Sequence, residues 1–238
     1  MKNRITEAVL IAVLLQLLAI ACSAANHQVT QSPPATDPAS PSISPSATPT
    51  PTSTAQFTDD PEQAKYLDAI ESLRVIPSEK PEYREVVERL LKHEDAVKQM
   101  LKGCDPLDAE APQLGSQFYK TSDSSYIVML QCFLGAYQGG FAFYLYTETP
   151  NGATVQPLTL DRYDDDAGKV KKTSSHTAAG YPEYNPDRKT LVLSTKYRGV
   201  GDCGTTGTYQ FANNKFVLKQ FEADFACDGK LQYKTVYP

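Results

Sequence analysis

Cysteine is the residue type in this chain with the most chemistry open to it, and there are five copies. Cys22 lies near the N-terminus, and the other four are Cys104, Cys132, Cys203 and Cys227. Four thiols in an exported chain predict two disulfides, with three possible pairings. We expect the first of the four to pair with the second and the third with the fourth, because each bond then closes a loop of about 25 residues, worth about 3 kcal/mol. Zinc binding is the alternative, but the sequence has no Cys-x-x-Cys pair and no histidine close to these cysteines.

Cys22 is a candidate for a different reaction, acylation. Residues 1–4 are basic, residues 8–20 are apolar apart from one glutamine, and small residues precede the cysteine. The apolar run is too short to span a bilayer and is typical of a signal peptide. We therefore expect residues 1–21 to be a lipoprotein signal peptide and Cys22 to carry the lipid, since stable anchoring needs more than one acyl chain. An ordinary signal peptide cut near Ala25 is the alternative.

Two further motifs resemble ligand-binding loops. Residues 199–204 match the dinucleotide pattern Gly-x-Gly-x-x-Gly, but strand-like residues follow instead of a helix, which argues against nucleotide binding. The glycines fit a tight turn beside a disulfide, where Asp202 can accept hydrogen bonds from backbone amides. The acidic stretch 161–168 offers oxygens for calcium but lacks the spacing of a calcium loop, and it equally fits a solvated hairpin turn. We predict no metal site and no cofactor.

Catalytic constellations are sparse. The sequence contains neither a Gly-x-Ser-x-Gly nor a His-Glu-x-x-His motif. His93 lies among charged residues and is expected to be exposed, while His176 lies in an expected polar loop. A carboxylate pair for sugar hydrolysis cannot be selected from so many acidic residues without geometry. A binding protein is therefore expected ahead of an enzyme.

The composition excludes other classes of partner. The formal net charge is -5 and the pI is about 5.3, so bulk attraction to nucleic acid or anionic lipid is not expected. Tryptophan is absent but tyrosine numbers 14, and tyrosine is common both in cores and on ligand-binding surfaces. The tyrosines expected near strand ends or loops are Tyr137, Tyr144, Tyr146, Tyr181, Tyr184 and Tyr197.

The remaining segments must position these residues. Residues 22–56 are rich in Pro, Ser and Thr and cannot bury enough apolar surface to fold, so we expect a tether. Residues 57–103 are expected to form a helical lead-in of two helices. The first begins at Asp60 and ends before Pro77, and the second ends with Gly103 as its cap.

Residues 104–238 are expected to form a β-rich domain containing the disulfides. Period-two alternation and regular turn signals predict seven to nine antiparallel strands, arranged as a sandwich, a partly open barrel or a strongly twisted sheet. The fold class is therefore α+β, mainly β. A turn is expected at residues 138–140, and Pro157 indicates an edge strand. A two-residue hairpin turn at residues 213–214 would pair Phe211 with Phe216 and Tyr209 with Leu218.

Two motifs in this domain resemble a known family. Residues 198–204 read Arg-Gly-x-Gly-Asp-Cys-Gly, followed by Tyr209, Phe211, Phe216 and a Cys-Asp-Gly element at 227–229. Together with a cysteine and Gly-Ala-Tyr at 132–137, they resemble the bacterial exported family known as domain of unknown function 1176. The resemblance covers residues 114–237 and leaves out the helices before Gly103. It implies an exported β-rich domain with disulfides and transfers no catalytic residue.

The expected protein is a lipid-anchored binding module of the bacterial envelope, facing the periplasm or the exterior. Its working surface is expected around Tyr137, Arg198 and Asp202, because loops on a rigid scaffold usually carry function. The expected partners are the membrane, through the lipid, and an envelope protein or glycan, with no nucleic acid and no nucleotide. A hydrolase acting on envelope glycans or peptides is the alternative, and a structural spacer without a ligand is a third possibility.

Overall fold

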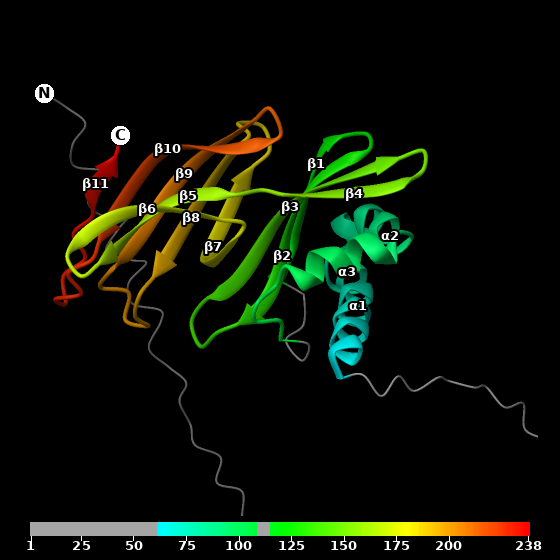
Figure 1. Cartoon of the computed structure of the whole chain (residues 1–238), viewed down its shortest axis with the longest axis horizontal. Coiled ribbons are helices and arrows are strands. Elements are labelled where there is room, and N and C mark those ends of the chain that lie inside the picture. Colours follow the sequence, from blue (N-terminus) through cyan, green and yellow to red (C-terminus); the bar gives the residue numbers. More distant parts are fainter. Residues whose placement is uncertain (1–60, 109–114) are drawn as a thin grey trace, which may run out of the picture. The chain divides into compact units, whose positions relative to one another are not determined.

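A computed structural model describes residues 61–108 and 115–238 of the chain (Figure 1). Within these residues the helices are α1 (Pro61–Glu79), the 3-10 turn η1 (Pro81–Tyr83), α2 (Arg84–Leu91) and α3 (Glu94–Lys102). The strands are β1 (Gln117–Ser122), β2 (Ser125–Leu134), β3 (Gly139–Thr149), β4 (Gly152–Pro157), β5 (Leu160–Asp166), β6 (Lys169–Ser175), β7 (Thr177–Asn185), β8 (Thr190–Lys196), β9 (Gly204–Ala212), β10 (Lys215–Asp224) and β11 (Lys234–Tyr237). The expected mainly-β class is confirmed.

Nine of the described strands form one antiparallel sheet, in the order β1-β2-β3-β7-β8-β9-β10-β11, with β4 also paired to β3. Strands β5 and β6 form a separate hairpin. The nine-stranded sheet agrees with the expected seven to nine strands, and the hairpin adds two. Its turn is the alternative that the sequence left open for the acidic stretch 161–168, whereas its two strands are not predicted, because they are polar and lack an apolar alternation.

Strand β3 branches the sheet. Its first residues pair with β7, from Gly139 opposite Gly180, and its last residues pair with β4, from Tyr144 opposite Pro157. A close backbone approach requires glycine at the branch: Gly180 has a φ of +145°, and a Cβ there would lie 2.5 Å from a carbonyl oxygen of β8. Strand β3 therefore pairs with three strands, β2, β4 and β7.

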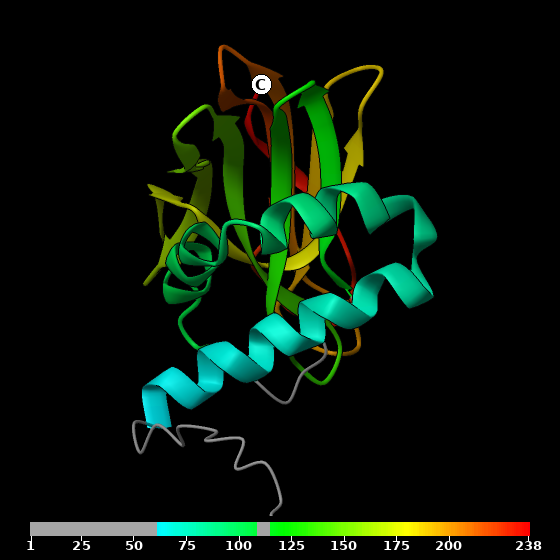
Figure 2. The ribbon, with the colours of Figure 1, turned by 90° about the vertical axis from the view of Figure 1, so that its right-hand side faces the viewer.

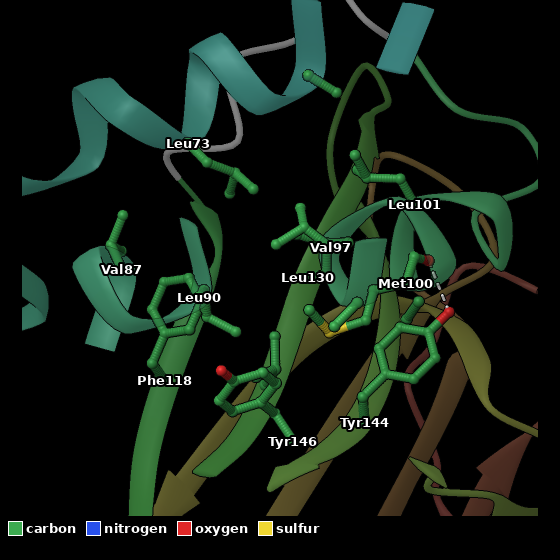
Figure 3. Close-up of a cluster of buried hydrophobic side chains, with 14 of the residues drawn as sticks. Leu73, Val87, Leu90, Val97, Met100, Leu101, Phe118, Leu130, Tyr144 and Tyr146 are labelled. Atoms are coloured by element: carbon green, nitrogen blue, oxygen red, sulfur yellow. Dashed lines mark hydrogen bonds between the residues drawn. The ribbon is translucent and has the colours of Figure 1, made fainter. Parts of the chain in front are cut away.

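The three α-helices cover one face of strands β1–β4 (Figure 2). Helix α1 supplies Leu73, and α3 supplies Val97 and Met100, all of which are almost fully buried. Figure 3 shows these side chains converging on Leu130 of β2 and on two tyrosines of β3. The Tyr144 hydroxyl donates a hydrogen bond of 2.8 Å to the Met100 carbonyl oxygen, which satisfies the end of α3.

A second core lies on the other face of β2 and β3. Alternate residues of β2 divide between the cores, so that Val128 packs toward the helices and Ile127 toward the second core. There, side chains of β2 and β3 meet those of β7–β10 and of the segment before β5. Tyr209 of β9 is almost fully buried in this core and donates a hydrogen bond to the Asp161 carbonyl oxygen at 2.9 Å.

The helical segment differs from its prediction at two points. Helix α1 continues through Pro77 to Glu79, because Ile76 is fully buried and its packing outweighs the preference of a pre-proline residue for extended backbone. The expected second helix is divided into α2 and α3 at His93, whose φ and ψ of -123° and 60° are not helical. The division lets each half turn its apolar face to the sheet.

The local turn predictions have mixed outcomes. The hairpin at residues 213–214 is confirmed, with both asparagines at positive φ and with Phe211 opposite Phe216. Strand β4 pairs only with β3 among the described strands, as expected for an edge strand. The turn expected at residues 138–140 is wrong by a few residues, because it occupies 135–138 and β3 already begins at Gly139. There the sheet tolerates glycines that pack against aromatic rings.

Both predicted disulfides are confirmed. Cys104 at the end of the helical layer is bonded to Cys132 of β2, and Cys203 is bonded to Cys227 after β10. The predicted signal peptide, Cys22, the whole predicted tether and the expected helix start at Asp60 lie outside the described residues. Among the residues that are described, no helix is both long and apolar enough to cross a membrane.

Candidate functional site

Two loops meet at one end of the sheet and form what we call the loop cluster, residues 135–138 and 197–203. The Gln138 carboxamide ties the first loop to Lys196, the last residue of β8 before the second loop. It donates to the Lys196 carbonyl oxygen at 3.1 Å and accepts from the Lys196 amide at 3.0 Å. The Tyr137 hydroxyl adds a bond of 3.3 Å to the Tyr197 carbonyl oxygen. Tyr137 and Arg198, singled out separately in the sequence, therefore lie in one structural unit.

Two half-exposed tyrosines border the loop cluster. Tyr137 is 40% exposed and Tyr181, in the middle of β7, is 41% exposed. The Tyr181 hydroxyl donates a short hydrogen bond to the Tyr137 carbonyl oxygen. The Lys196 ammonium lies 5.3 Å from the Tyr181 ring centre, within the range of a cation–π interaction. Each ring is thus held in place by the protein while part of its surface stays open to solvent.

Gly199 brings the second loop against Tyr137. A Cβ built at Gly199 would lie 3.4 Å from the Cδ1 atom of the Tyr137 ring, so the backbone itself flanks the ring. Gly201, in the same loop, has a φ of +72°, which favours glycine. The glycines of the Gly-x-Gly-x-x-Gly pattern therefore serve a turn that packs on an aromatic ring.

Arg198 and Asp202 form a clamp beside the second disulfide. The Arg198 guanidinium contacts both Asp202 carboxylate oxygens, with Nε at 3.1 Å from Oδ1, and also donates to the Cys227 carbonyl oxygen at 2.7 Å. The Gly229 amide donates to the same carboxylate at 3.0 Å. The hydrogen bond from Arg198 holds the pKa of Asp202 below its usual value. The Asp202 side chain is 11% exposed, so the pair ties two loops together and leaves little carboxylate surface for a ligand.

A groove opens beside the loop cluster. Its volume is about 610 Å³, and it lies between the β2–β3 turn, the middle of β7, the start of β1 and the segment after α1. Leu134, 60% exposed, and the two tyrosines give it apolar surface, while Gln131 and Phe141 line its interior. A groove of this size is within the usual range of about 300–1,000 Å³ for ligand sites.

The structure divides the six tyrosines between core and surface. Tyr144, Tyr146 and Tyr184 are buried, whereas Tyr137, Tyr181 and Tyr197 are at least one-third exposed. The sequence placed Tyr137 in the expected working surface. It gave no reason to place Tyr181 or Leu134 beside Tyr137. Tyr181 is 44 residues away in sequence, and only the pairing of Gly139 with Gly180 places the two rings together.

The two candidate histidines among the described residues do not line this groove. His176 is half-buried at the join of β6 and β7, with its ring 5.6 Å from that of Tyr144. His93, expected to be exposed, is half-buried where α2 gives way to α3, with its ring 6.4 Å from that of Tyr146.

The acidic stretch forms a cross-strand ladder with β6. Asp161 pairs with Lys172 at 2.8 Å, and this contact lowers the pKa of Asp161. Asp164 accepts from Thr173 at 2.6 Å, and Asp166 pairs with Lys171. Within the described residues no group of three or more acidic, histidine or cysteine side chains is arranged to hold a metal ion. Asp161, Asp164 and Asp166 are instead engaged with basic side chains and hydroxyls of the same hairpin.

These features define a class: a disulfide-stapled antiparallel β domain with a helical layer on one face and an aromatic groove at one end. The chain belongs to the family described as "Protein of unknown function (DUF1176)", which it matches over residues 21–238. The match includes the helices, so the narrower span of 114–237 expected from the motifs is wrong. Neither the curated proteins nor the solved structures contain a match to the chain.

Proposed function

We propose that this protein is a lipid-anchored binding module of the bacterial envelope and that it binds its ligand in the groove beside the loop cluster. The observation that carries the proposal is the pair of tyrosines, Tyr137 and Tyr181, held by hydrogen bonds and yet half exposed. Rings that are already oriented lose little conformational freedom on binding, which favours affinity. Arg198 and Asp202 hold the loop that flanks Tyr137 and act as positioning residues.

The compartment is inferred from the thiols. Two disulfides, each between consecutive cysteines of the described domain, support an oxidising location, because cytosolic proteins seldom keep structural disulfides. The basic residues 1–4, the apolar run 8–20 and the small residues before Cys22 support export and acylation. The proline-rich residues 22–56 would then separate the folded domain from the lipid headgroups.

A hydrolase is the weaker alternative. Glycoside hydrolysis requires two carboxyl groups flanking the bond that breaks. Among the described residues that line the groove, Glu183 is the one carboxylate. Asp202, in the neighbouring loop, has a pKa lowered by Arg198, which is opposite to the change that a proton donor at neutral pH needs. These observations favour binding over catalysis.

Co-sedimentation with isolated bacterial envelopes tests the binding function. We expect the full chain in detergent to sediment with wall-containing envelope fragments. Most of the Tyr137→Ala variant should instead stay in the supernatant. Tyr233→Ala is the matched control, because Tyr233 is also 40% exposed but does not line the groove. Equal retention of the Tyr137→Ala variant and the wild-type chain would contradict a working surface at the groove.

Mass spectrometry of the mature protein tests the anchor. We expect the N-terminal residue to be Cys22 carrying acyl chains, with residues 1–21 absent. Cys22→Ala should yield a protein that partitions into the aqueous phase of a detergent extraction. A mature chain that begins near residue 26 without lipid would instead show an ordinary signal peptide.

A further inference from the structure

We infer that the groove binds a neutral N-acetylated glycan chain, with sugar rings stacked on Tyr137 and Tyr181. The inference rests on the proposed binding function and names its ligand class. The first argument is what the tyrosines present. Both hydroxyls are already bonded to backbone carbonyl oxygens, so the rings offer their π surfaces rather than their hydroxyls. A π face carries partial negative charge and attracts the polarised C–H groups on the flat side of a sugar ring.

The charge of the groove argues for an uncharged ligand. Apart from the tyrosines, the ionisable residues among its described lining are Lys80 and Glu183, which carry opposite charges. A phosphate-rich polymer or an anionic lipid surface would require an excess of cations, as would any strongly acidic chain. The net charge of -5 on the whole chain adds to the repulsion of such ligands. A neutral polymer meets no such penalty.

Two half-buried carboxamides provide hydrogen bonds for such a ligand. Gln117 and Gln138 line the groove, and each donates one amide hydrogen to a backbone carbonyl oxygen. Gln131 also lies in the lining but is buried and bonded within the protein. Those bonds orient the amides, and a carboxamide nitrogen has a second hydrogen to donate. Hydroxyl and acetamido groups are uncharged and both accept and donate, so they match a site built from amides rather than from charged groups.

The apolar part of the groove favours a ligand that carries acetyl groups. Leu134 is 60% exposed in the same lining as the tyrosines, which also includes the buried Phe141. A sugar with only hydroxyls would leave Leu134 facing polar atoms, whereas the methyl of an acetamido group would cover apolar surface and gain the hydrophobic contribution. A proline-rich peptide also stacks on aromatic rings. Its prolines lack an N–H group, so it offers few donors to the second lone pair of the Gln117 and Gln138 carboxamide oxygens, whereas hydroxyl and acetamido groups can donate there as well as accept, and the glycan is favoured.

The test is titration of the full chain in detergent with tetra-N-acetylchitotetraose, followed by calorimetry and by saturation-transfer NMR on the sugar. We expect binding that changes little between low and high salt, and acetyl methyl protons that receive the strongest saturation. Tyr137→Ala and Tyr181→Ala should each weaken binding about tenfold or more, and Leu134→Ser should weaken it several-fold. Tyr233→Ala should bind like the wild-type chain, and circular dichroism will confirm that each variant is folded.

Three results of the sugar titrations would overturn the inference. They are the absence of tetrasaccharide binding to the wild-type chain, binding that Tyr137→Ala leaves unchanged, and equal or tighter binding of cellotetraose, which lacks acetamido groups. Tyr137-dependent binding of a proline-rich peptide in place of the sugar would also overturn it. If envelope retention still depended on Tyr137 in that case, the proposed binding function would stand and the ligand class alone would fail.

Discussion

Single side chains next to the second disulfide show how this protein secures the loops that border its groove. Arg198 and Asp202 lie four residues apart, and together they contact the backbone of Cys227 and Gly229. Two charge-assisted contacts from one arginine give the loop a fixed geometry. A binding loop with a firmly held base can keep an aromatic ring such as Tyr137 in position without a ligand.

The Asp202 contact predicts a specific pH dependence. Because its pKa is lower in the folded chain than in the unfolded chain, the carboxylate stabilises the fold above about pH 4 and this contribution is lost as the pH falls through the folded value. Asp202→Asn removes the charge, so we expect it to be less stable than the wild-type chain at pH 6. Urea unfolding at pH 6 and pH 3 measures this, and the difference should shrink at pH 3. A constant difference would contradict the ion pair.

Two buried tyrosines form a contrasting pair. The Tyr144 hydroxyl donates to the Met100 carbonyl oxygen, whereas the buried Tyr126 hydroxyl has no hydrogen-bond partner among the described groups. We expect Tyr144→Phe to cost about 1 kcal/mol and Tyr126→Phe to be neutral or stabilising, because removing an unpaired buried hydroxyl relieves its desolvation. Thermal unfolding of both variants measures this, and equal losses would contradict the assignment.

The pKa of Tyr144 provides a second test of the Tyr144→Phe variant. Burial raises this pKa to about 12, above the ordinary value of 10.0. The phenol therefore contributes stability that is fully present below pH 10 and is lost as the pH rises through its folded value. The wild-type chain should lose more stability than Tyr144→Phe between about pH 10 and pH 12.

At the scale of elements, the turn at residues 213–214 predicts its own mutational response. Asn213 and Asn214 have φ values of 51° and 59°, which asparagine tolerates better than alanine. We expect Asn214→Ala to lose about 1 kcal/mol, whereas Asn214→Gly should keep or slightly raise stability. Urea unfolding compares the two variants. If they were equally stable, the positive φ at this position would be contradicted.

The sequence predicts those elements whose signals are local. The hairpin at residues 213–214 and both disulfides follow from turn chemistry and cysteine spacing. Strand β7 is not predicted, because Gly180 and Pro182 within it are strand breakers that only the paired neighbours accommodate. The break between α2 and α3 at His93 is not predicted, because no glycine or proline lies at that position.

The candidate site was predictable only in part for the same reason. Tyr137 and Arg198 lie in loops with distinctive sequences, and their proximity depends on two turns of one sheet. Tyr181 is one of six tyrosines considered from the sequence, with nothing to connect it to Tyr137, and Leu134 carries no local signal. They join the groove because β3 pairs with both β2 and β7, which is a non-local consequence of sheet order. Alternation along a strand identifies its buried positions but not which strand lies beside it.

At the scale of the whole described domain, β2 and β3 belong to both cores. Val128 and Leu130 of β2 pack under the helices, while Ile127 and Met129 pack against β7–β10. The disulfide from Cys104 to β2 links the end of the helical layer to the same strand. A loosening on either face therefore acts on the strands that support the other face, including the turn that carries Tyr137.

This sharing predicts cooperative unfolding of the helical layer and the sheet. Leu73→Ala opens a cavity in the helix-side core and Leu218→Ala opens one in the second core, and each should cost about 3 kcal/mol because both leucines are buried. For each variant we expect the far-ultraviolet signal of the helices and the near-ultraviolet signal of the tyrosines to shift together in urea. A Leu73→Ala chain whose helices unfold well before the tyrosine signal changes would show that the helical layer is an independent unit, and that the groove does not depend on it.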